Sequence, residues 1–166
     1  KDLDAVLDAA TASGSVPGVV AAVTDRSGVL YRCASGVADI ATGAPMRTDA
    51  VFRIASMTKL LTSIAVLQLH ERSLVDLDAP FARYFPSFRQ PPVLRSFDFA
   101  TRTFEASSAA SAITVRQLLT HTSGYGYWFL HRELFELMGA EPEYYNPPFL
   151  MSEPGTEFHY GIGTDV

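Results

Sequence analysis

A lysine stands in the first turn of the longest apolar helical pattern of the chain, three residues after a serine. The run from Thr58 to Leu74 carries apolar residues at helical spacing, which predicts a helix that begins near Ser56. Lys59 would then face the positive end of the helix dipole, at a cost of up to about 1 kcal/mol. The chain has fourteen serines and only two lysines, so chance rarely produces this Ser-x-x-Lys pair. A residue that breaks a local rule in this way indicates a functional site.

Residues three apart share a helix face, so the Ser56 hydroxyl and the Lys59 amine are expected within hydrogen-bond reach. A serine hydroxyl becomes a nucleophile when a base removes its proton, and burial near a helix N-terminus favours the uncharged amine that such a base requires. The backbone N–H of Ser56 would donate to a developing oxyanion. On these residues alone a second interpretation stays equally open, in which Ser56 is a helix N-cap and Lys59 a solvated surface residue.

Composition narrows the classes of function. A chain of 166 residues with 48% hydrophobic and 19% charged residues can bury a substantial core. Its net charge of −5, without a basic block, argues against nucleic acid as a partner, and no apolar run is long enough for a membrane span. We expect a cytoplasmic protein, although a periplasmic or secreted one whose signal peptide had been removed would show the same sequence.

Metal and thiol chemistry find little support. The four histidines are scattered outside any metal-binding pattern, and no Gly-x-Ser-x-Gly elbow indicates a Ser-His-Asp triad. The single Cys33 lies in a strand-like segment and is interpreted as a packed small hydrophobe rather than a nucleophile. We therefore expect no metal and no organic cofactor.

The order of elements is predicted from periodicity and turn residues. We expect a first helix with an apolar stripe from Leu3 to Ala10, and a loop-rich segment from Gly36 to Ala50. Thr114 should cap a short helix that ends at Leu119. The other predictions are a hairpin of strands Val19–Thr24 and Val29–Ala34, a ribbon of Val93–Phe97 and Thr103–Glu105, and a helix over His131–Met138.

Four segments in this order resemble the serine β-lactamase and penicillin-binding protein superfamily, most closely class C β-lactamases and family VIII carboxylesterases. They are Phe52–Lys59, Leu74–Pro80, Ile113–Gly124 and Pro154–Tyr160. The resemblance implies an α+β fold of the α/β sandwich type, in which an antiparallel sheet flanked by helices lies beside a helical region. Residues 1–55 would supply the first helix and strands, and residues 56–166 the helical region.

The resemblance also implies roles for three residues. Ser56 would be the acylated nucleophile, and Lys59 and Tyr160 would transfer the proton. The family element Tyr-x-Asn has Ile162 in its third position here, which favours simple esters over β-lactams. The expected function is hydrolysis of short-chain carboxylic esters through an acyl-enzyme. The alternatives are a class C-like β-lactamase, a D-alanyl-D-alanine peptidase, an acyltransferase or a non-catalytic penicillin-recognising domain.

One family element has no counterpart before Val166: the late strand that carries Lys-Thr-Gly or its equivalent and supplies a second oxyanion donor. We therefore expect this chain to be the N-terminal part of the fold, completed by a continuation or a second polypeptide.

An aromatic run follows the turn His121–Gly124. Tyr125, Tyr127, Trp128 and Phe129 are candidates for the lining of an acyl or alcohol pocket, with core packing as an equal alternative. His121 is interpreted as a structural hydrogen-bonding residue of its turn rather than as a catalytic one.

Overall fold

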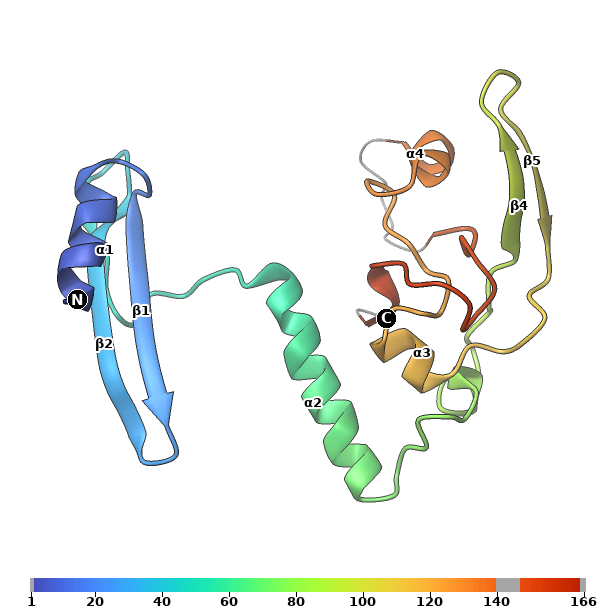
Figure 1. The fold of residues 1–166 in the computed structure, drawn as a ribbon, viewed down its shortest axis with the longest axis horizontal. Coiled ribbons are helices and arrows are strands. Elements are labelled where there is room, and N and C mark those ends of the chain that lie inside the picture. The colour runs from blue at the N-terminus through green and yellow to red at the C-terminus, as the bar shows by residue number, and fades with distance from the viewer. Residues whose placement is uncertain (1, 140–146, 165–166) are drawn as a thin grey trace. The chain divides into compact units, whose positions relative to one another are not determined.

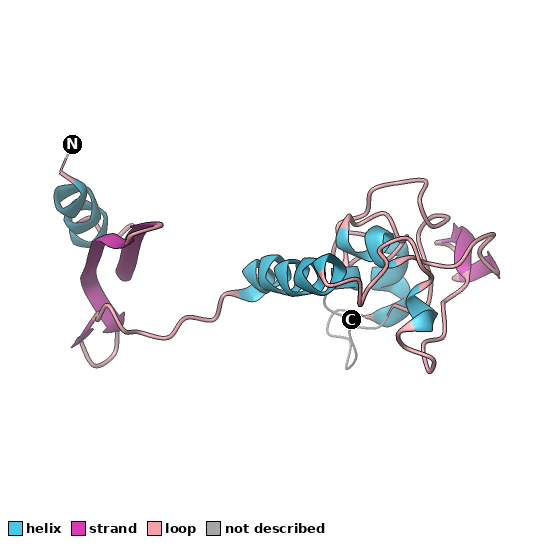
Figure 2. Ribbon diagram, turned by 90° about the horizontal axis from the view of Figure 1, so that it is seen from below, coloured by secondary structure: helices cyan, strands magenta, loops and turns pink. Residues whose placement is uncertain are grey.

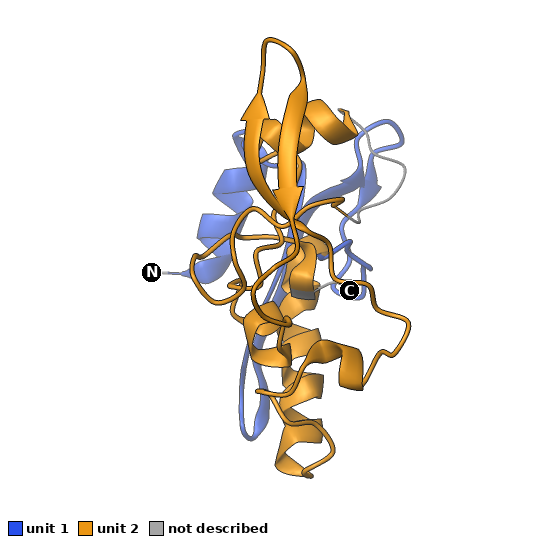
Figure 3. Ribbon diagram, turned by 90° about the vertical axis from the view of Figure 1, so that its right-hand side faces the viewer, with its two compact units in different colours: residues 1–54 blue, residues 55–166 orange. Residues whose placement is uncertain are grey.

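A computed structural model describes residues 2–139 and 147–164 of the chain. The chain divides into two units, residues 1–54 and residues 55–166, which Figure 3 colours blue and orange. The second unit contains residues 140–146 and 165–166, which lie outside the described residues. Within the described residues no helix combines the length and the apolar character that a membrane crossing would need.

The first unit is a helix and an antiparallel hairpin. Helix α1 (Leu3–Ala12) begins at Asp2, whose side chain accepts a hydrogen bond from the Asp4 N–H. Strands β1 (Gly18–Asp25) and β2 (Gly28–Asp39) pair in antiparallel register, and the short β3 (Ala44–Pro45) pairs with β2. The predicted first helix and hairpin are thereby confirmed, and Cys33 is a half-buried free cysteine in β2.

Polar side chains join α1 to β2. The Ser35 hydroxyl donates to Asp8 at 2.6 Å and lies 2.9 Å from the Thr11 hydroxyl. Tyr31 donates to Asp4 at 2.7 Å, and this hydrogen bond lowers the pKa of the Asp4 carboxyl.

The prediction of a loop from Gly36 to Ala50 is wrong in part, because β2 continues to Asp39 and β3 returns along it. The Asp39 carboxylate accepts from the backbone N–H groups of Ala41 and Thr42, which makes a tight turn. The extended backbone on both sides of this turn can then pair.

The second unit combines short helices with a two-stranded ribbon (Figures 1 and 2). Strands β4 (Val93–Asp98) and β5 (Thr103–Ser107) form the antiparallel ribbon that was predicted, and α4 (Arg132–Met138) confirms the helix expected after His131. The remaining elements are the 3₁₀ turns η1 (Ala55–Met57), η2 (Phe81–Arg83) and η3 (Ile162–Thr164), and the helices α2 (Thr58–Glu71) and α3 (Val115–Leu119).

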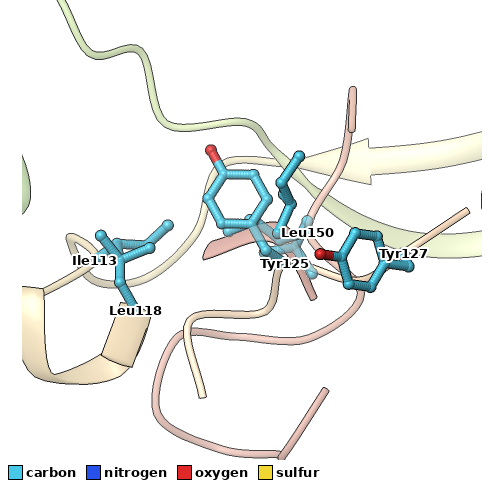
Figure 4. Close-up of a cluster of buried hydrophobic side chains, with 7 residues drawn as sticks. Ile113, Leu118, Tyr125, Tyr127 and Leu150 are labelled. Carbon is cyan, nitrogen blue, oxygen red and sulfur yellow. The ribbon is translucent and has the colours of Figure 1, made fainter. Parts of the chain in front are cut away.

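A buried cluster holds the second unit together. Figure 4 shows several of its side chains gathered around Tyr125, which is 2% exposed. Its members come from β4, the residues just before α3, α3 itself, the aromatic turn after α3, a residue bridged to β4, and η3: Val93, Ile113, Leu118, Tyr125, Tyr127, Leu150 and Ile162. Segments far apart in sequence therefore meet in one core.

Helix α2 differs from its sequence prediction in two respects. It ends at Glu71 instead of Leu74, because Ser73 adopts a left-handed backbone with φ of 58°. Its apolar side chains were expected to pack on one side, yet several are exposed in this chain, among them Leu60, Leu61 and Ile64. Only Lys59, near its N-terminal end, is buried.

Helix α3 begins with the predicted cap. The Thr114 hydroxyl accepts from the Gln117 N–H at 3.2 Å, and the Gln117 side chain accepts from the Thr114 N–H at 2.9 Å. This capping box satisfies two N–H groups that the helix leaves unpaired.

We expect Thr114→Ala to lower the free energy of unfolding by about 1 kcal/mol, because it removes the acceptor at the start of α3. Chemical denaturation of the full-length protein measures the change, with Thr48→Ala at an exposed loop position as the matched control. Equal stability of the two variants would show that the capping box contributes nothing.

Candidate active site

The chain approaches the start of α2 through a strained residue. Ala55 has φ of 45°, in the left-handed region that costs a residue with a side chain of order 1 kcal/mol. Ser56 follows it in η1 and is exposed. The N-cap of α2 is Met57, whose side chain makes no capping hydrogen bond. Ser56 is therefore not the helix N-cap that the structural interpretation of the sequence required.

Lys59 is buried, with 8% of its surface exposed. Its Nζ donates a hydrogen bond of 2.8 Å to the hydroxyl of Tyr127, which is itself buried. The alternative of a solvated surface lysine is wrong. The prediction that Lys59 lies in the first turn of α2 is confirmed.

The ring of Tyr160 also lies near the Lys59 amine. The Lys59 Nζ is 5.6 Å from the centre of the Tyr160 ring and 5.3 Å from that of Tyr127. The two tyrosine rings are 5.6 Å apart and inclined by 49°. One amine and two phenols, from three separate segments, therefore form a cluster at the start of α2.

His121 holds the segment that carries Tyr160. Its carbonyl oxygen accepts from the His159 N–H at 2.8 Å, and its Nδ1 accepts from the Gly161 N–H at 3.4 Å. Its ring also lies 4.8 Å from the ring of Tyr160. These contacts agree with the structural role expected for His121, because both residues that flank Tyr160 bond to it.

Backbone hydrogen bonds also join the turn after α3 to the segment from Met151 to Gly155. Gly124 O accepts from the Met151 N–H and Thr122 O from the Gly155 N–H, each at 2.7 Å. Glu153 adds an ion pair with Arg95 of β4, and this hydrogen bond lowers the pKa of the Glu153 carboxyl. The turn that leads to Tyr127 is thus held by backbone hydrogen bonds from Met151 and Gly155.

Gly161 allows the two tyrosine segments to approach each other. A Cβ atom at this position would lie 2.2 Å from the backbone oxygen of Tyr125, too close for a real contact. Because the obstructing atom belongs to the backbone, a side chain would have to push the segments apart.

Gly161→Ala should therefore lower the free energy of unfolding by about 1–3 kcal/mol. Gly163→Ala is the matched control, since its Cβ would come closest to the side-chain ends of Leu118 and Ser123, both at 3.2 Å, and would lie at an ordinary contact distance of 3.6 Å from the Leu118 backbone oxygen. Denaturant unfolding compares the two. A Gly161→Ala protein no less stable than Gly163→Ala would mean that the close approach is unimportant.

The four aromatic residues proposed for a pocket differ in their surroundings. Tyr125 lies in the core, and Tyr127 bonds to Lys59. Phe129 is 56% exposed and stacks on Tyr127 at 4.8 Å, and the half-buried Trp128 packs edge-on against Phe129 at 5.4 Å. The sequence did not indicate Tyr127 as the partner of Lys59. The sequence feature that could have drawn attention to Tyr127 is its position between Gly126 and two further aromatic residues.

Two histidine rings, those of His131 and His159, pack against each other. The rings of His131 and His159 are 5.0 Å apart, and the His159 Nε2 is 3.5 Å from a carboxylate oxygen of Glu157. Burial lowers the pKa of His131 below its usual 6.5, and the neighbouring His159 adds to this, while Glu133 opposes it. Among the described residues no group of three or more His, Cys, Asp and Glu side chains is arranged to hold a metal ion.

The lowered pKa of His131 makes stability depend on pH in a defined direction. The unfolded chain binds this proton more readily than the folded one, so stability present above pH 6.5 is lost as the pH falls through the folded-state pKa. Denaturation at several values between about pH 7.5 and about pH 5.5 measures the loss. His131→Gln should show a shallower decline than the wild type. Identical slopes for the two proteins would contradict the assignment.

A family model described as Beta-lactamase matches residues 3–165. The chain belongs to the beta-lactamase family. The chain is also similar to a structure of the simvastatin synthase LovD from Aspergillus terreus, a LovD6 mutant, which superimposes with a TM-score of 0.81 at 37% identity over 98% of this chain. The β-lactamase-like fold expected from the sequence is thereby confirmed.

Two curated relatives are similar in sequence. Esterase EstB from Burkholderia gladioli is 44% identical over 128 residues, which cover 77% of this chain and 29% of EstB. Acyltransferase calJ from Penicillium decumbens is 36% identical over 197 residues, covering 99% of this chain and 46% of calJ. The chain also covers 42% of the LovD structure, so it spans less than half the length of these relatives.

Proposed function

We propose that the protein transfers the acyl group of a carboxylic ester through a covalent intermediate on Ser56, with Lys59 and Tyr160 moving the proton. The observation that carries this proposal is the buried Lys59 amine, three residues after an exposed serine and beside the Tyr160 ring. Burial disfavours the charged ammonium form of Lys59, and a general base must be the uncharged amine. The two aromatic faces oppose this effect, because they stabilise a cation.

The proposed reaction has two steps. The Ser56 oxygen attacks the ester carbonyl while its proton passes to the Lys59 amine, and the proton then reaches the departing alkoxide by way of Lys59 and Tyr160. The alcohol leaves and the acyl group remains on Ser56. Water then attacks the acyl-enzyme, gives its proton to the same groups, and releases the acid together with the regenerated serine. The Ser56 N–H would donate to the oxyanion in both steps.

Ile162 favours an ester over a β-lactam as substrate. It occupies the third position of the family's Tyr-x-Asn element, and in the structure its side chain belongs to the buried cluster. An apolar side chain offers no amide to a β-lactam side chain, and an amide in this core would need new hydrogen-bond partners. The esterase name of EstB agrees with this preference.

Transfer to an alcohol instead of water is the second candidate. It is favoured by the similarity to calJ, an acyltransferase, over nearly the whole of this chain. Both reactions share the acyl-enzyme and differ only in the nucleophile that attacks it.

Further polypeptide should be needed for activity. The relatives are more than twice as long as the region that they share with this chain, and apolar side chains of α2 are exposed within it. Extended apolar surface of this kind usually marks an interface. We therefore propose that additional sequence, or a second chain, covers α2 and supplies the second oxyanion donor.

We expect Ser56→Ala to abolish both the turnover of a short-chain p-nitrophenyl ester and covalent labelling by a fluorophosphonate probe. Peptide mass analysis of the labelled full-length protein locates the adduct. Ser87→Ala, at an exposed loop position, is the matched control and should keep both properties. Labelling of Ser56→Ala at another serine would refute the assignment of the nucleophile.

The products formed by the unmutated full-length protein distinguish the candidate functions. Release of acid without transfer to added alcohols supports hydrolysis, and formation of a new ester supports the acyltransferase. Nitrocefin turnover faster than ester turnover would instead support a β-lactamase.

A further inference from the structure

Tyr127 contacts both groups of the proposed proton path, although neither the family pattern described above nor the sequence gives it a part in the reaction. Its hydroxyl accepts the hydrogen bond from Lys59 at 2.8 Å, and its ring lies 5.6 Å from that of Tyr160. We propose that Tyr127 is a positioning residue, whose hydroxyl holds the Lys59 amine where it can exchange a proton with Ser56 and Tyr160. This inference rests on the proposed function.

The first argument is that a buried lysine amine needs fixed acceptors. The ammonium group offers three donors on a flexible four-carbon stem, and each donor left unpaired in the interior is costly. Lys59 and Tyr127 are both buried, so their hydrogen bond forms where water competes little. The bond therefore restricts the amine to a small part of the space that the side chain could reach.

The second argument is that Tyr127 is closely packed on several sides. A Cβ atom on the preceding Gly126 would lie 2.4 Å from the ring of His131, so the backbone is closely packed at that point. The Tyr127 ring stacks on Phe129 with an angle of 19° between the rings, and it belongs to the buried cluster. An acceptor held in this way can fix the position of a flexible partner.

The third argument concerns the groups that surround the amine. Among the described contacts of Lys59, the titratable side chains are Tyr127 and Tyr160, and the ring of His121 lies 4.8 Å from that of Tyr160. Because Tyr127 accepts from Lys59, its hydroxyl stabilises the charged amine more than the neutral one. Removing the hydroxyl should change both the position of the amine and the pH at which it loses its proton.

The test is Tyr127→Phe, which keeps the stacked ring and removes only the hydroxyl. We expect kcat for a p-nitrophenyl ester to fall about 100-fold, the cost of displacing a reacting group by about 1 Å, while KM changes little. The acid limb of the pH–rate profile should move to lower pH, because the charged amine has lost an acceptor. A residue with only a structural role would not move this limb.

Tyr125→Phe is the matched control. It removes a buried phenol hydroxyl two residues away, from the core rather than from Lys59, and should leave kcat and the acid limb unchanged. Thermal unfolding of both variants confirms that they fold. If Tyr127→Phe does not fold, site-specific 3-fluorotyrosine at position 127 weakens the acceptor without changing its shape and should move the limb in the same direction.

The outcomes separate this inference from the proposed function. Wild-type kcat and an unmoved acid limb in Tyr127→Phe, together with an inactive Ser56→Ala, would overturn the positioning role alone. Activity and labelling retained in Ser56→Ala would overturn the proposed function, and the positioning role with it.

Discussion

The hydrogen bond between the Lys59 amine and the Tyr127 hydroxyl joins two segments that lie 68 residues apart. A buried amine is tolerated only where polar or aromatic groups receive it, and here the receiving groups come from the turn after α3 and from the segment before η3. The same bond brings the start of α2 to the core of the second unit. Local packing and the proposed chemistry thus depend on one contact.

The surroundings of this contact explain several features that look unfavourable by themselves. Ala55 has a left-handed backbone next to the exposed serine, and α2 begins without a side-chain cap. Gly161 is required because a side chain would collide with the backbone of the adjacent turn. Strain and unsatisfied groups of this kind accumulate at functional sites, where the surrounding packing sustains them.

Local elements were predictable from the sequence because their signals are local. The capping residue Thr114, the hairpin of β1 and β2 and the start of α2 each follow from a few neighbouring residues. The role of Tyr127 was not predictable, since it depends on a distant partner, and an aromatic run fits a pocket, a core or a hydrogen-bonding position equally well. The exposed apolar side chains of α2 show the same limit: periodicity predicts that a helix has an apolar surface, but not what covers it.

A crystal structure of the full-length protein with a phosphonate adduct would test the central claim most directly. The account predicts the phosphorus on the Ser56 oxygen, with the Lys59 Nζ within about 2.6–3.2 Å of that oxygen and still bonded to the Tyr127 hydroxyl. An adduct on another serine, or a Lys59 side chain that has turned away from both hydroxyls, would contradict it.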